Sequence, residues 1–454
     1  MLSKKSNAPK WWDHFIRWFA PGMKVKRWIL LILFGFFLLA VAVMVLIDFT
    51  SLGIVKRAVI DFLIDVFGKN RMYTPDWMSP ILGILVLSGA SYFVIIGIRN
   101  LLRSVIDSLL PEREREISDL IREYRFRDDM LNVLVIGGGT GIYPFLEALK
   151  TLPVSTTAIV TVADSGGSSG ILRSEYSIPA PGDIRRALIA LSDRKSTDLD
   201  HLFNYRFEEG SLRGHTVGNL MIAGYTEMTG DFSESIFKMS QILSVKGKVI
   251  PFTLNNLTLC AEFEDGSVVQ GEAEIHKIGK PIKRVFYDPP YYKPMIRVIE
   301  ELDKADIVLM GPGSLYTSIL PCLIISPIAD ILFQSDALKI YIANLMTETG
   351  ETDNLSVTGH LKALFFNAGK KVADYVMVNN GTINPSLQEF YKKYNASPVY
   401  PDVEAIKSLQ VEPLFYDLVD QASDRIRHSP DKVKTALVDV IHKFSTIRGK
   451  KIRF

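Results

Sequence analysis

Two glycine-rich stretches of the sequence each follow an apolar run with the composition of a buried strand. The first is Gly137-Gly138-Gly139-Thr140-Gly141, and the second is Gly311-Pro312-Gly313-Ser314-Leu315-Tyr316-Thr317. Glycines at a strand-to-helix turn let backbone N–H groups approach an anion closely, and the helix N-terminus adds a favourable dipole. The first turn departs from a G-x-G-x-x-G pattern, so tight packing of a strand against a helix is the alternative. Two such turns in one sheet favour a phosphate-binding site.

A third loop of small residues begins with an acid. It reads Asp164-Ser165-Gly166-Gly167-Ser168-Ser169-Gly170 and follows another apolar strand. The carboxylate of Asp164 is suited to accept a hydrogen bond from a ribose hydroxyl or to hold a divalent metal such as Mg²⁺. Open α/β sheets bind ligands beyond the carboxyl ends of their strands, which is where this loop is expected. A flexible loop without a ligand is the alternative.

The segment Pro181-Gly182-Asp183-Ile184-Arg185-Arg186 predicts a helix that Asp183 caps, with Arg185 and Arg186 in its first turn. Basic residues are poorly matched to the positive end of the helix dipole unless they face an anion. The pair therefore favours contact with a phosphate, although two arginines on a solvated helix face are also common.

Two further segments carry polar groups where helices are expected to start. His215 and Asn219 are four residues apart on one helix face, and the histidine is a candidate phosphate donor or general acid, or else a simple cap. The loop from Asn344 to Asn354, which includes Met346 and Thr347, follows an apolar strand. Its amides and acids would read a base or a ribose, or its last residue would cap the next helix.

The alternation of strand-like and helical segments beyond residue 130 predicts an α/β fold: a Rossmann-like, doubly wound, mostly parallel sheet. A β-hairpin over residues 257–263 and 267–271, turning at Asp265-Gly266, is expected as an insertion. Asp231-Phe232-Ser233-Glu234 is a capping-box signal for one further helix. The other expected strands span residues 132–136, 157–162, 306–310, 338–343 and 375–378, and the other expected helices span residues 183–191, 217–228, 295–302 and 355–365.

The N-terminal part of the chain has the composition of membrane-spanning helices. Residues 28–47 and 80–98 carry no charge, and each is long enough for a helix to cross about 30 Å of hydrocarbon. A cleaved signal peptide is the alternative for the first span, but its apolar core is longer than such peptides have and no small-x-small site follows. A buried soluble helix is the alternative for the second. Basic residues precede the first span and follow the second. We therefore expect both termini and the large domain in the cytoplasm, held at the inner membrane.

The expected organisation has four parts. A basic cytoplasmic segment covers residues 1–27, and a two-span membrane anchor with an outer loop covers residues 28–98. An amphipathic connector follows over residues 99–130, and the ligand-binding domain covers residues 131–454. Within the outer loop, residues 54–67 are expected to form a helix in the membrane interface or against the spans.

The composition excludes some classes of partner. The 52 Lys and Arg residues balance 50 Asp and Glu residues to a net charge of +2, so the chain has no global basic field that would attract a nucleic acid. The two cysteines, Cys260 and Cys322, lack the short spacing of a zinc or redox pair and are expected to be buried thiols. The mean hydropathy of +0.16 agrees with a membrane segment.

Taken in order, six motifs resemble the CofD/YvcK-like family of 2-phospho-L-lactate transferases and gluconeogenesis-factor proteins. The resemblance covers about residues 132–428 and leaves out the two predicted spans. The loop over residues 344–352 is more similar to the gluconeogenesis-factor branch. The six motifs are the two glycine-rich turns, the Asp164 loop, the segment from Pro181 to Arg186, Gly214-His215-Thr216-Val217-Gly218-Asn219 and Asn344-Leu345-Met346-Thr347.

The resemblance implies a phosphorylated nucleotide ligand. The transferase branch moves a phospholactyl group from a guanosine diphosphate-linked donor to a deazaflavin with magnesium, whereas the other branch looks like a binder of UDP-sugars linked to cell-envelope growth and cell shape. Two positions depart from the usual pattern of that second branch: Ser165 replaces an aspartate and Ile171 replaces an arginine. These departures weaken metal binding and phosphate binding at those two positions.

We therefore expect a membrane-anchored, UDP-sugar-binding regulatory protein with no certain cofactor, working as a homodimer with cell-envelope proteins. The alternative is a magnesium-dependent phosphotransferase in which Asp164 and Asp183 hold the metal, so enzymatic activity stays open. Two other functions fit the motifs less well. The function of a nicotinamide oxidoreductase would not explain the second glycine turn, and that of a scaffold would not explain the clustered glycines and arginines. The candidate ligand-binding residues are Gly138, Gly139, Thr140, Gly141, Asp164, Ser165, Gly167, Ser168, Ser169, Asp183, Arg185, Arg186, His215, Asn219, Gly311, Gly313, Ser314, Tyr316, Thr317, Asn344, Met346 and Thr347, of which Asp164 is also the candidate metal ligand.

Overall fold

The computed structural model describes residues 25–46, 78–109, 130–193, 198–290 and 292–444 of the chain. The chain forms two compact units, residues 1–121 and 122–454. The boundary between the units falls within residues 99–130, the segment that the sequence predicted to be a connector.

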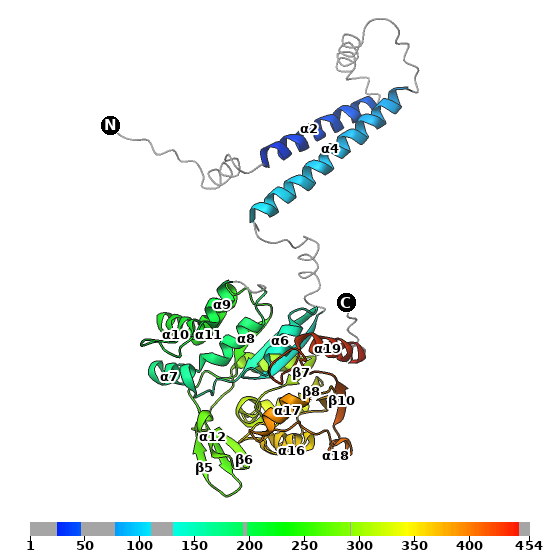
Figure 1. The fold of residues 1–454 in the computed structure, drawn as a ribbon. Helices are drawn as coiled ribbons and strands as arrows, with labels where there is room; N and C mark the ends of the chain where they lie inside the picture. The colour runs from blue at the N-terminus through cyan, green and yellow to red at the C-terminus, as the bar shows by residue number, and fades with distance from the viewer. Residues whose placement is uncertain (1–24, 47–77, 110–129, 194–197, 291, 445–454) are drawn as a thin grey trace, which may run out of the picture. The chain divides into compact units, whose positions relative to one another are not determined.

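The larger unit is built on a seven-stranded sheet in which every neighbouring pair of strands is parallel (Figure 1). The strand order is β10-β9-β8-β7-β1-β2-β3. This arrangement confirms the predicted α/β fold with a doubly wound sheet. The strands are β1 (Leu131–Gly137), β2 (Val154–Val160), β3 (Lys248–Pro251), β7 (Ile307–Met310), β8 (Leu338–Ile342), β9 (Tyr375–Asn379) and β10 (Glu412–Tyr416).

The strand order reverses at the centre of the sheet, between β1 and β7. After β1 the chain adds β2 and β3 on one side, and later it adds β7 to β10 on the other side. Gly137 at the end of β1 is in register with Val160 of β2, and Ile136 is in register with Met310 of β7. The loops after β2, β1, β7 and β8 therefore leave the sheet side by side, at the edge where open α/β sheets bind ligands.

Helices flank the sheet and bury its apolar side chains. The strand β1 is buried along nearly its whole length, as expected for a parallel strand covered on both faces. The helices α6, α8 and α19 pack together, and α13 to α16 form a second group. The helices are α6 (Tyr143–Leu149), α7 (Gly167–Tyr176), α8 (Pro181–Ala190), α9 (Asp198–Asn204), α10 (Val217–Thr229), α11 (Phe232–Ile242), α13 (Ile296–Lys304), the π-helix η3 (Leu315–Ile319), α14 (Leu320–Leu323), α15 (Ile328–Gln334), α16 (Val357–Ala368), α17 (Pro385–Lys392), α18 (Val403–Ser408) and α19 (Pro430–Phe444).

A small antiparallel lobe is inserted between β3 and β7 and projects from the main sheet (Figure 1). It contains β4 (Thr258–Phe263), β5 (Val268–Gln270), α12 (Glu272–Ile278) and β6 (Ile282–Asp288). The predicted hairpin is confirmed as β4 and β5. The third strand, β6, was missed because Lys283 and Arg284 interrupt its apolar pattern; both side chains pair with Glu262 on β4, at 2.8 and 2.6 Å.

Most of the predicted elements are present, with ends that differ by a few residues. The short outer strands β3 and β10 were not predicted, because four or five residues give too little pattern to recognise. The Asp231 carboxylate caps α11, accepting from the N–H groups of Ser233 and Glu234 at 2.7 and 3.3 Å, as the sequence predicted. The predicted cap at Asn354 is wrong: the hydroxyl of Ser356 caps α16, accepting from the Gly359 N–H at 3.2 Å.

The smaller unit contains two long apolar helices, α2 (Val25–Leu46) and α4 (Met78–Leu109), packed against each other. Glycines lie at their contact. A Cβ atom on Gly35 would lie 2.7 Å from Cγ2 of Val94, and one on Gly97 would lie 2.5 Å from Cγ1 of Ile32. Small residues that let helix backbones approach closely are typical of helix pairs in membranes. The helix α4 continues to residue 109, so the start of the predicted connector belongs to this helix.

Over the described residues, one helix is long and apolar enough to cross a membrane, Gly83–Leu101. The apolar part of α2 that the structure describes, Arg27–Val43, is shorter. Two consecutive helices that meet at a bend, Leu315–Leu323 and Ile328–Gln334, are long and apolar enough only if they are counted together as one broken span. Their side chains pack in the core of the larger unit. Both predicted spans are therefore helical over the described residues, and among those residues the second passes the test of length and composition for a span. Residues 1–24 of the predicted basic segment (residues 1–27) and the whole predicted outer-loop helix (residues 54–67) lie outside the described residues.

Candidate functional site

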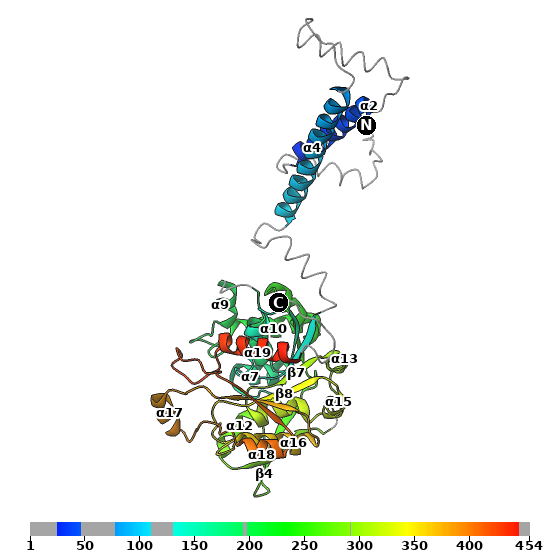
Figure 2. The same ribbon diagram turned by 90° about the vertical axis from the view of Figure 1, so that its right-hand side faces the viewer.

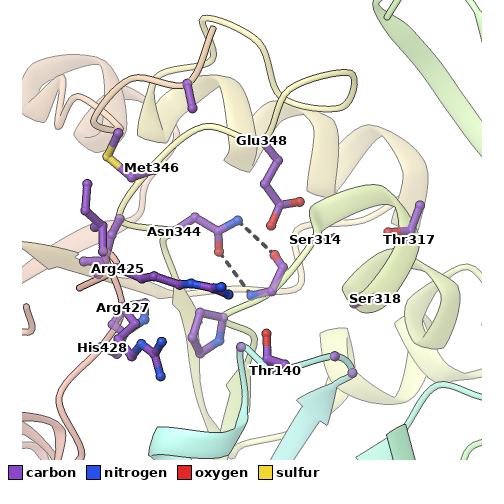
Figure 3. A pocket seen from close by; sticks show the side chains of 18 of the residues that line it. Thr140, Ser314, Thr317, Ser318, Asn344, Met346, Glu348, Arg425, Arg427 and His428 are labelled. Carbon is purple, nitrogen blue, oxygen red and sulfur yellow. Dashed lines mark hydrogen bonds between the residues drawn. The ribbon is translucent and has the colours of Figure 1, made fainter. Parts of the chain in front are cut away.

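A cavity of about 1010 Å³ lies at the carboxyl edge of the central strands of the larger unit. Its wall comes from the loops that follow β1, β2, β7 and β8, from α12 of the lobe, from the end of α17 and the residues after it, and from the segment before α19. The volume is at the upper end of what ligand sites in proteins show. Figure 3 shows part of this wall from close by.

The two glycine-rich turns touch each other at the floor of the cavity. A Cβ atom on Gly141 would lie 2.4 Å from the carbonyl oxygen of Pro312 and 2.8 Å from Cα of Gly313, so only glycine fits there. Gly139 has a φ of +67°, a conformation that favours glycine. The backbone N–H groups of Thr140 and Ser314 donate to no acceptor among the described residues. The contact between the two turns leaves two donors at the cavity wall.

Asn344, at the end of β8, fixes the second turn. Its side-chain oxygen accepts from the N–H of Gly313 at 3.1 Å, and its side-chain nitrogen donates to the Gly313 carbonyl at 3.0 Å (Figure 3). These two hydrogen bonds fix Gly313, and with it the peptide bond that carries the Ser314 N–H. The sequence suggested that Asn344 reads a base or ribose, whereas the structure uses its amide for positioning.

An acidic end of the cavity is formed by Asp164, Asp183 and Glu272. Asp183 does not cap α8 as predicted; it lies in the first turn, accepts from the N–H of Gly139 at 2.7 Å and pairs with Arg186. Asp164 accepts from the Gly166 N–H at 2.8 Å. Burial raises the pKa of Asp164 to about 6, and the Asp183 carboxylate adds to the shift. A carboxyl group with such a pKa is typical of functional sites.

The raised pKa of Asp164 has a testable consequence for stability. The folded state holds this proton more tightly than the unfolded chain, whose aspartates have an ordinary pKa of 3.8. The contribution of Asp164 to stability is therefore present below pH 3.8 and is lost as the pH rises through about 6. We expect Asp164→Asn to raise the free energy of unfolding by about 1–3 kcal/mol at pH 7.5, measured by urea denaturation. The gain should vanish at pH 4, and a variant less stable than the wild type at pH 7.5 would contradict this account.

A basic end of the cavity was not predicted. Arg425, Arg427 and His428 extend from the segment before α19 toward Ser314 and Thr140 (Figure 3). A short antiparallel bridge positions this segment, since Val419 pairs with His428 and the Asp420 N–H donates to the Arg427 carbonyl at 2.9 Å.

The side chain of Arg425 has no partner among the described residues, and Arg427 has only Asp424, 4.0 Å away. Burial lowers the pKa of His428 to about 4, so its imidazole is neutral, and its Nε2 has no hydrogen-bond partner in the part of the chain that the structure describes. Two exposed guanidinium groups beside the N–H donors are suited to hold a diphosphate. The one sequence signal for them was the alternation of basic residues just before the last helix.

A buried acid under the second turn ties the lobe to the sheet. Glu351 accepts from the Thr317 hydroxyl at 2.7 Å and from the Tyr316 N–H at 3.3 Å, and Nδ1 of His276 lies 3.1 Å from the same carboxylate. His276 also lies 3.4 Å from Glu272. These carboxylates raise the pKa of His276 to about 9, so its imidazole is charged at neutral pH. Burial raises the pKa of Glu348, the neighbouring acid on the cavity wall.

The structure brings part of the predicted site to the cavity wall. Ligand binding by these residues stays a prediction. The predicted residues in the wall are Gly138, Gly139, Thr140, Gly141, Asp164, Asp183, Arg186, Gly313, Ser314, Thr317, Asn344, Met346 and Thr347. The wall residues that sequence reasoning missed include Glu272, His276, Glu348, Phe390, Tyr391, Tyr394, Arg425, Arg427 and His428.

The other predicted residues lie outside the cavity wall: Ser165, Gly167, Ser168, Ser169, Arg185, His215, Asn219, Gly311 and Tyr316. Four of them form a buried network. The Ser168 hydroxyl lies 3.0 Å from Nδ1 of His215 and accepts from the Asn219 amide at 3.2 Å, and Arg185 donates to Asn219 at 3.1 Å. The network joins α7, α8 and α10. Arg185, which seemed mismatched to a helix start, is therefore paired with protein amide groups.

Two more of these residues attach the lobe. The Ser165 hydroxyl accepts from the N–H of Ala273 at 3.0 Å, and the Tyr316 hydroxyl donates to the Ile282 carbonyl at 3.1 Å. Ser165 thus helps to hold α12 beside the cavity, and Tyr316 holds β6.

A magnesium ion fits this cavity only together with a ligand. Among the described residues, no group of three or more His, Cys, Asp or Glu side chains is arranged to hold a metal. Both oxygens of Asp183 are engaged, by Gly139 and Arg186, whereas Oδ2 of Asp164 accepts no hydrogen bond from the described residues. Mg²⁺ is commonly bound by one or two carboxylates and the phosphates of a substrate, with water filling the remaining positions. Asp164 would supply such a carboxylate.

Comparison with known proteins places the chain in a family. The family model described as 2-phospho-L-lactate transferase CofD matches residues 133–419. The protein named gluconeogenesis factor of Halalkalibacterium halodurans is 46% identical over 309 residues, covering 68% of this chain and 96% of that protein. The protein of the same name in Bacillus subtilis is 44% identical over 310 residues, 68% of this chain and 98% of its own length.

A putative gluconeogenesis factor of Clostridium acetobutylicum is 35% identical over 432 residues, covering 94% of this chain and 92% of its own, so its similarity includes the smaller unit. A crystal structure of a UPF0052-family protein from Bacillus halodurans has a TM-score of 0.66 and 46% identity, over 68% of this chain and 99% of that one. The chain therefore belongs to the CofD family and is related within it to the gluconeogenesis factors.

Proposed function

We propose that this chain binds a nucleoside diphosphate-sugar, of the UDP-sugar class, in the cavity of its larger unit. We further propose that it acts as a regulatory protein of the gluconeogenesis-factor type, linked to cell-envelope growth and cell shape. The observation that carries the first proposal is the contact of the two glycine turns opposite Arg425 and Arg427. Backbone donors on one side and guanidinium groups on the other make a cradle for a diphosphate.

The acidic end supports a sugar next to that diphosphate. Carboxylates accept hydrogen bonds from hydroxyl groups, and Asp164 and Glu272 line the cavity beside the first glycine turn. A phosphate placed directly against these acids would be repelled. The cavity therefore favours a ligand with an anionic middle and a hydroxyl-rich end, which describes a nucleotide-sugar.

The experiment that tests this function is a calorimetric titration of the purified full chain in detergent. UDP-sugars, free UDP, GDP and NAD are compared with and without Mg²⁺, and the ligand is recovered afterwards. The proposal predicts saturable binding that prefers UDP-sugars, with the ligand recovered intact. Failure of every nucleoside diphosphate to bind would refute it.

The two arginines give a sharper prediction. We expect Arg425→Ala combined with Arg427→Ala to lower the affinity for a UDP-sugar by about 100-fold or more, since hydrogen bonds to charged groups contribute about 1.5–3 kcal/mol each. The thermal midpoint should not change, because both side chains are exposed. Arg284→Ala on the lobe, away from the cavity wall, is the matched control. Equal affinity of the double variant and the control for the UDP-sugar would show that the two arginines do not contact the ligand.

We also propose that the smaller unit anchors the protein in the cell membrane. Large apolar side chains on its helix pair face outward, among them Leu85 and Ile95, which are each 65% exposed. Such a surface is unfavourable in water and suits contact with lipid. The full chain is expected to stay in the membrane fraction after washing with high salt and alkaline carbonate. Release by either wash would contradict anchoring. A cytoplasmic position of the larger unit, envelope partners and a homodimer remain part of the proposal.

One observation favours a second function. The raised pKa of Asp164 next to Asp183 marks a place where a cation would relieve repulsion between two carboxylates. A magnesium-dependent transferase acting on a nucleoside diphosphate-linked donor would use such a site, with Asp164 as the metal ligand. The ligand recovered after the titration distinguishes the two functions. Magnesium-dependent cleavage of the ligand would establish turnover, and recovery of intact ligand would favour the regulatory function.

A further inference from the structure

The outward side of α4 carries a polar side chain at its centre. Tyr92 lies in the middle of Gly83–Leu101, the part of α4 that has the length and composition of a membrane span. Its side chain is 62% exposed, and its hydroxyl donates to no acceptor among the described residues. Tyrosines of membrane helices are enriched at the two interfaces with water, where the hydroxyl is solvated. The depth of Tyr92 therefore requires another explanation.

The second helix of the smaller unit does not cover Tyr92. The helix α2 packs on the other side of α4, where Ala90 and Gly97 lie against Gly35 and Ile32. Figure 2 shows the two helices side by side, as Figure 1 does. With 3.6 residues per turn, Tyr92 points about 160° away from Ala90. The face of α4 that contains Tyr92 is therefore turned away from α2 and has no partner among the described residues.

The same face offers an acceptor that matches the Tyr92 hydroxyl. Ser88 lies one helical turn before Tyr92. Its hydroxyl donates to the Ile84 carbonyl at 2.8 Å, so its proton is used and its oxygen remains as an acceptor. Side chains on a helix lean toward the N-terminus, which brings the Tyr92 hydroxyl toward the level of Ser88. A donor and an acceptor thus lie at nearly the same depth on one face.

A hydrocarbon surrounding would leave this hydroxyl without any other partner. A hydroxyl that moves from water into an apolar medium without forming a hydrogen bond is unfavourable. The lean of the ring directs the hydroxyl away from Arg99, which marks the nearer charged end of the span. Serine and other polar side chains at such depths hydrogen-bond between helices, and this association brings helices together in membranes. The Tyr92 face is therefore suited to a second helix.

We propose that α4 pairs with α4 of a second copy of this chain through the face that contains Ser88 and Tyr92. The inference rests on the proposed membrane anchoring and is independent of the ligand in the cavity. Two copies in one membrane have the same orientation, so their helices run parallel about a twofold axis along the membrane normal. Equivalent residues then lie at equal depth, and each Tyr92 hydroxyl donates to the Ser88 oxygen of the other copy.

The composition of the face favours a second copy over another protein. This chain supplies both the donor and the acceptor of the hydrogen bond, so the face is complementary to itself under a twofold axis. Leu85 and Ile95, each 65% exposed, lie on the same face before and after the polar pair. They supply the apolar contacts that close packing between parallel helices requires.

The first test measures pairing of the full chain in lipid vesicles. Energy transfer between dyes on the N-terminal amines is followed as the lipid-to-protein ratio rises. Tyr92→Phe removes only the donor hydroxyl and Ser88→Ala removes only the acceptor, so each should weaken the dimer about 10- to 100-fold through the loss of two equivalent bonds. The double variant should be no weaker than either single variant, because all three lack the same bonds. Ser91→Ala is the matched control, since Ser91 lies about 100° around the helix from Tyr92.

A second test locates the face by cysteine cross-linking in the same vesicles. Leu85→Cys lies on the proposed face and should give a disulfide-linked dimer on oxidation, because the twofold axis brings the two thiols together. Phe37→Cys is the control: Phe37 is 64% exposed on α2, against 65% for Leu85, and points away from α4. The native thiols of Cys260 and Cys322 are buried and do not compete.

The remaining outcomes all count against the pairing. Absence of energy transfer in the wild type at every lipid ratio would show that the copies do not associate. Equal transfer in the wild type and in Tyr92→Phe would place the association on another surface, and equal cross-linking at the two cysteine positions would show random encounter. If alkaline carbonate releases the full chain from membranes, the proposed anchoring itself fails, which is distinguishable from an anchored chain that does not pair.

Discussion

Gly141→Val is expected to weaken nucleotide binding strongly. The Cβ atom would lie 2.4 Å from the Pro312 carbonyl oxygen, so one of the two glycine turns must move. The clamp of Asn344 on Gly313 holds the second turn, and the first turn is held by the bond from the Gly139 N–H to Asp183. We expect the affinity for a UDP-sugar to fall by about 100-fold, the size of effect that a misplacement of about 1 Å produces in sites that depend on positioning.

The same substitution should also destabilise the larger unit by about 1–3 kcal/mol, which is typical of overpacking. Gly224→Ala is the matched control, because no heavy atom lies within 4 Å of the place where its Cβ would be built. Calorimetry and urea denaturation of the two variants measure both effects. Binding at wild-type affinity by a folded Gly141→Val protein would show that the junction of the turns is not where the phosphate binds.

Glu351→Leu is expected to cause the largest loss of stability. The carboxylate is fully buried and is held by the Thr317 hydroxyl and the Tyr316 N–H, with the charged His276 beside it. Leucine fills a similar volume but leaves these donors without an acceptor. Burial raises the pKa of Glu351 to about 8, against the opposing effect of the charged His276, so the group acts mainly through its hydrogen bonds. A buried donor left without an acceptor costs about 1–3 kcal/mol, so with two such donors the free energy of unfolding should fall by about 2–6 kcal/mol.

Two further variants separate charge from hydrogen bonding. Glu351→Gln keeps an acceptor for Thr317 and should cost less than Glu351→Leu. Glu274→Leu removes an exposed acid of α12 whose one ion-pair partner among the described residues is Lys277, and should change stability by less than about 0.5 kcal/mol. Urea denaturation followed by circular dichroism gives all three values. If Glu351→Leu were as stable as the wild type, the proposed role of this acid in joining the lobe to the second glycine turn would be wrong.

The sheet and the glycine turns were predictable because their signals are local. The run from Leu131 to Gly137 is continuous and apolar, and the glycines follow it directly. Two turns after two strands of one parallel sheet must emerge at the same edge. Their contact requires in addition that the two strands are neighbours, as β1 and β7 are in the structure. The register of β1 with β7 then brings Gly141 against Pro312.

The basic end of the cavity and the aromatic residues of its wall were not predictable in the same way. Arg425 and Arg427 lie more than a hundred residues beyond Ser314 in sequence, and only the return of the chain before α19 brings them over the glycine turns. Phe390 and Tyr394 look like core residues of an amphipathic helix, and the sequence gives no sign that the rings face a cavity. Conversely, the sequence placed His215 and Asn219 at the ligand because polar residues at a helix start also suit an anion. The structure pairs them with Ser168 and Arg185 instead.

The most direct test of the central claim is the experimentally determined structure of the full chain with a UDP-sugar bound. The account predicts the diphosphate between the two glycine turns, accepting from the N–H groups of Thr140 and Ser314 and from Arg425 or Arg427. The sugar should face Asp164. A UDP-sugar bound elsewhere, with this cavity empty of ligand, would contradict it.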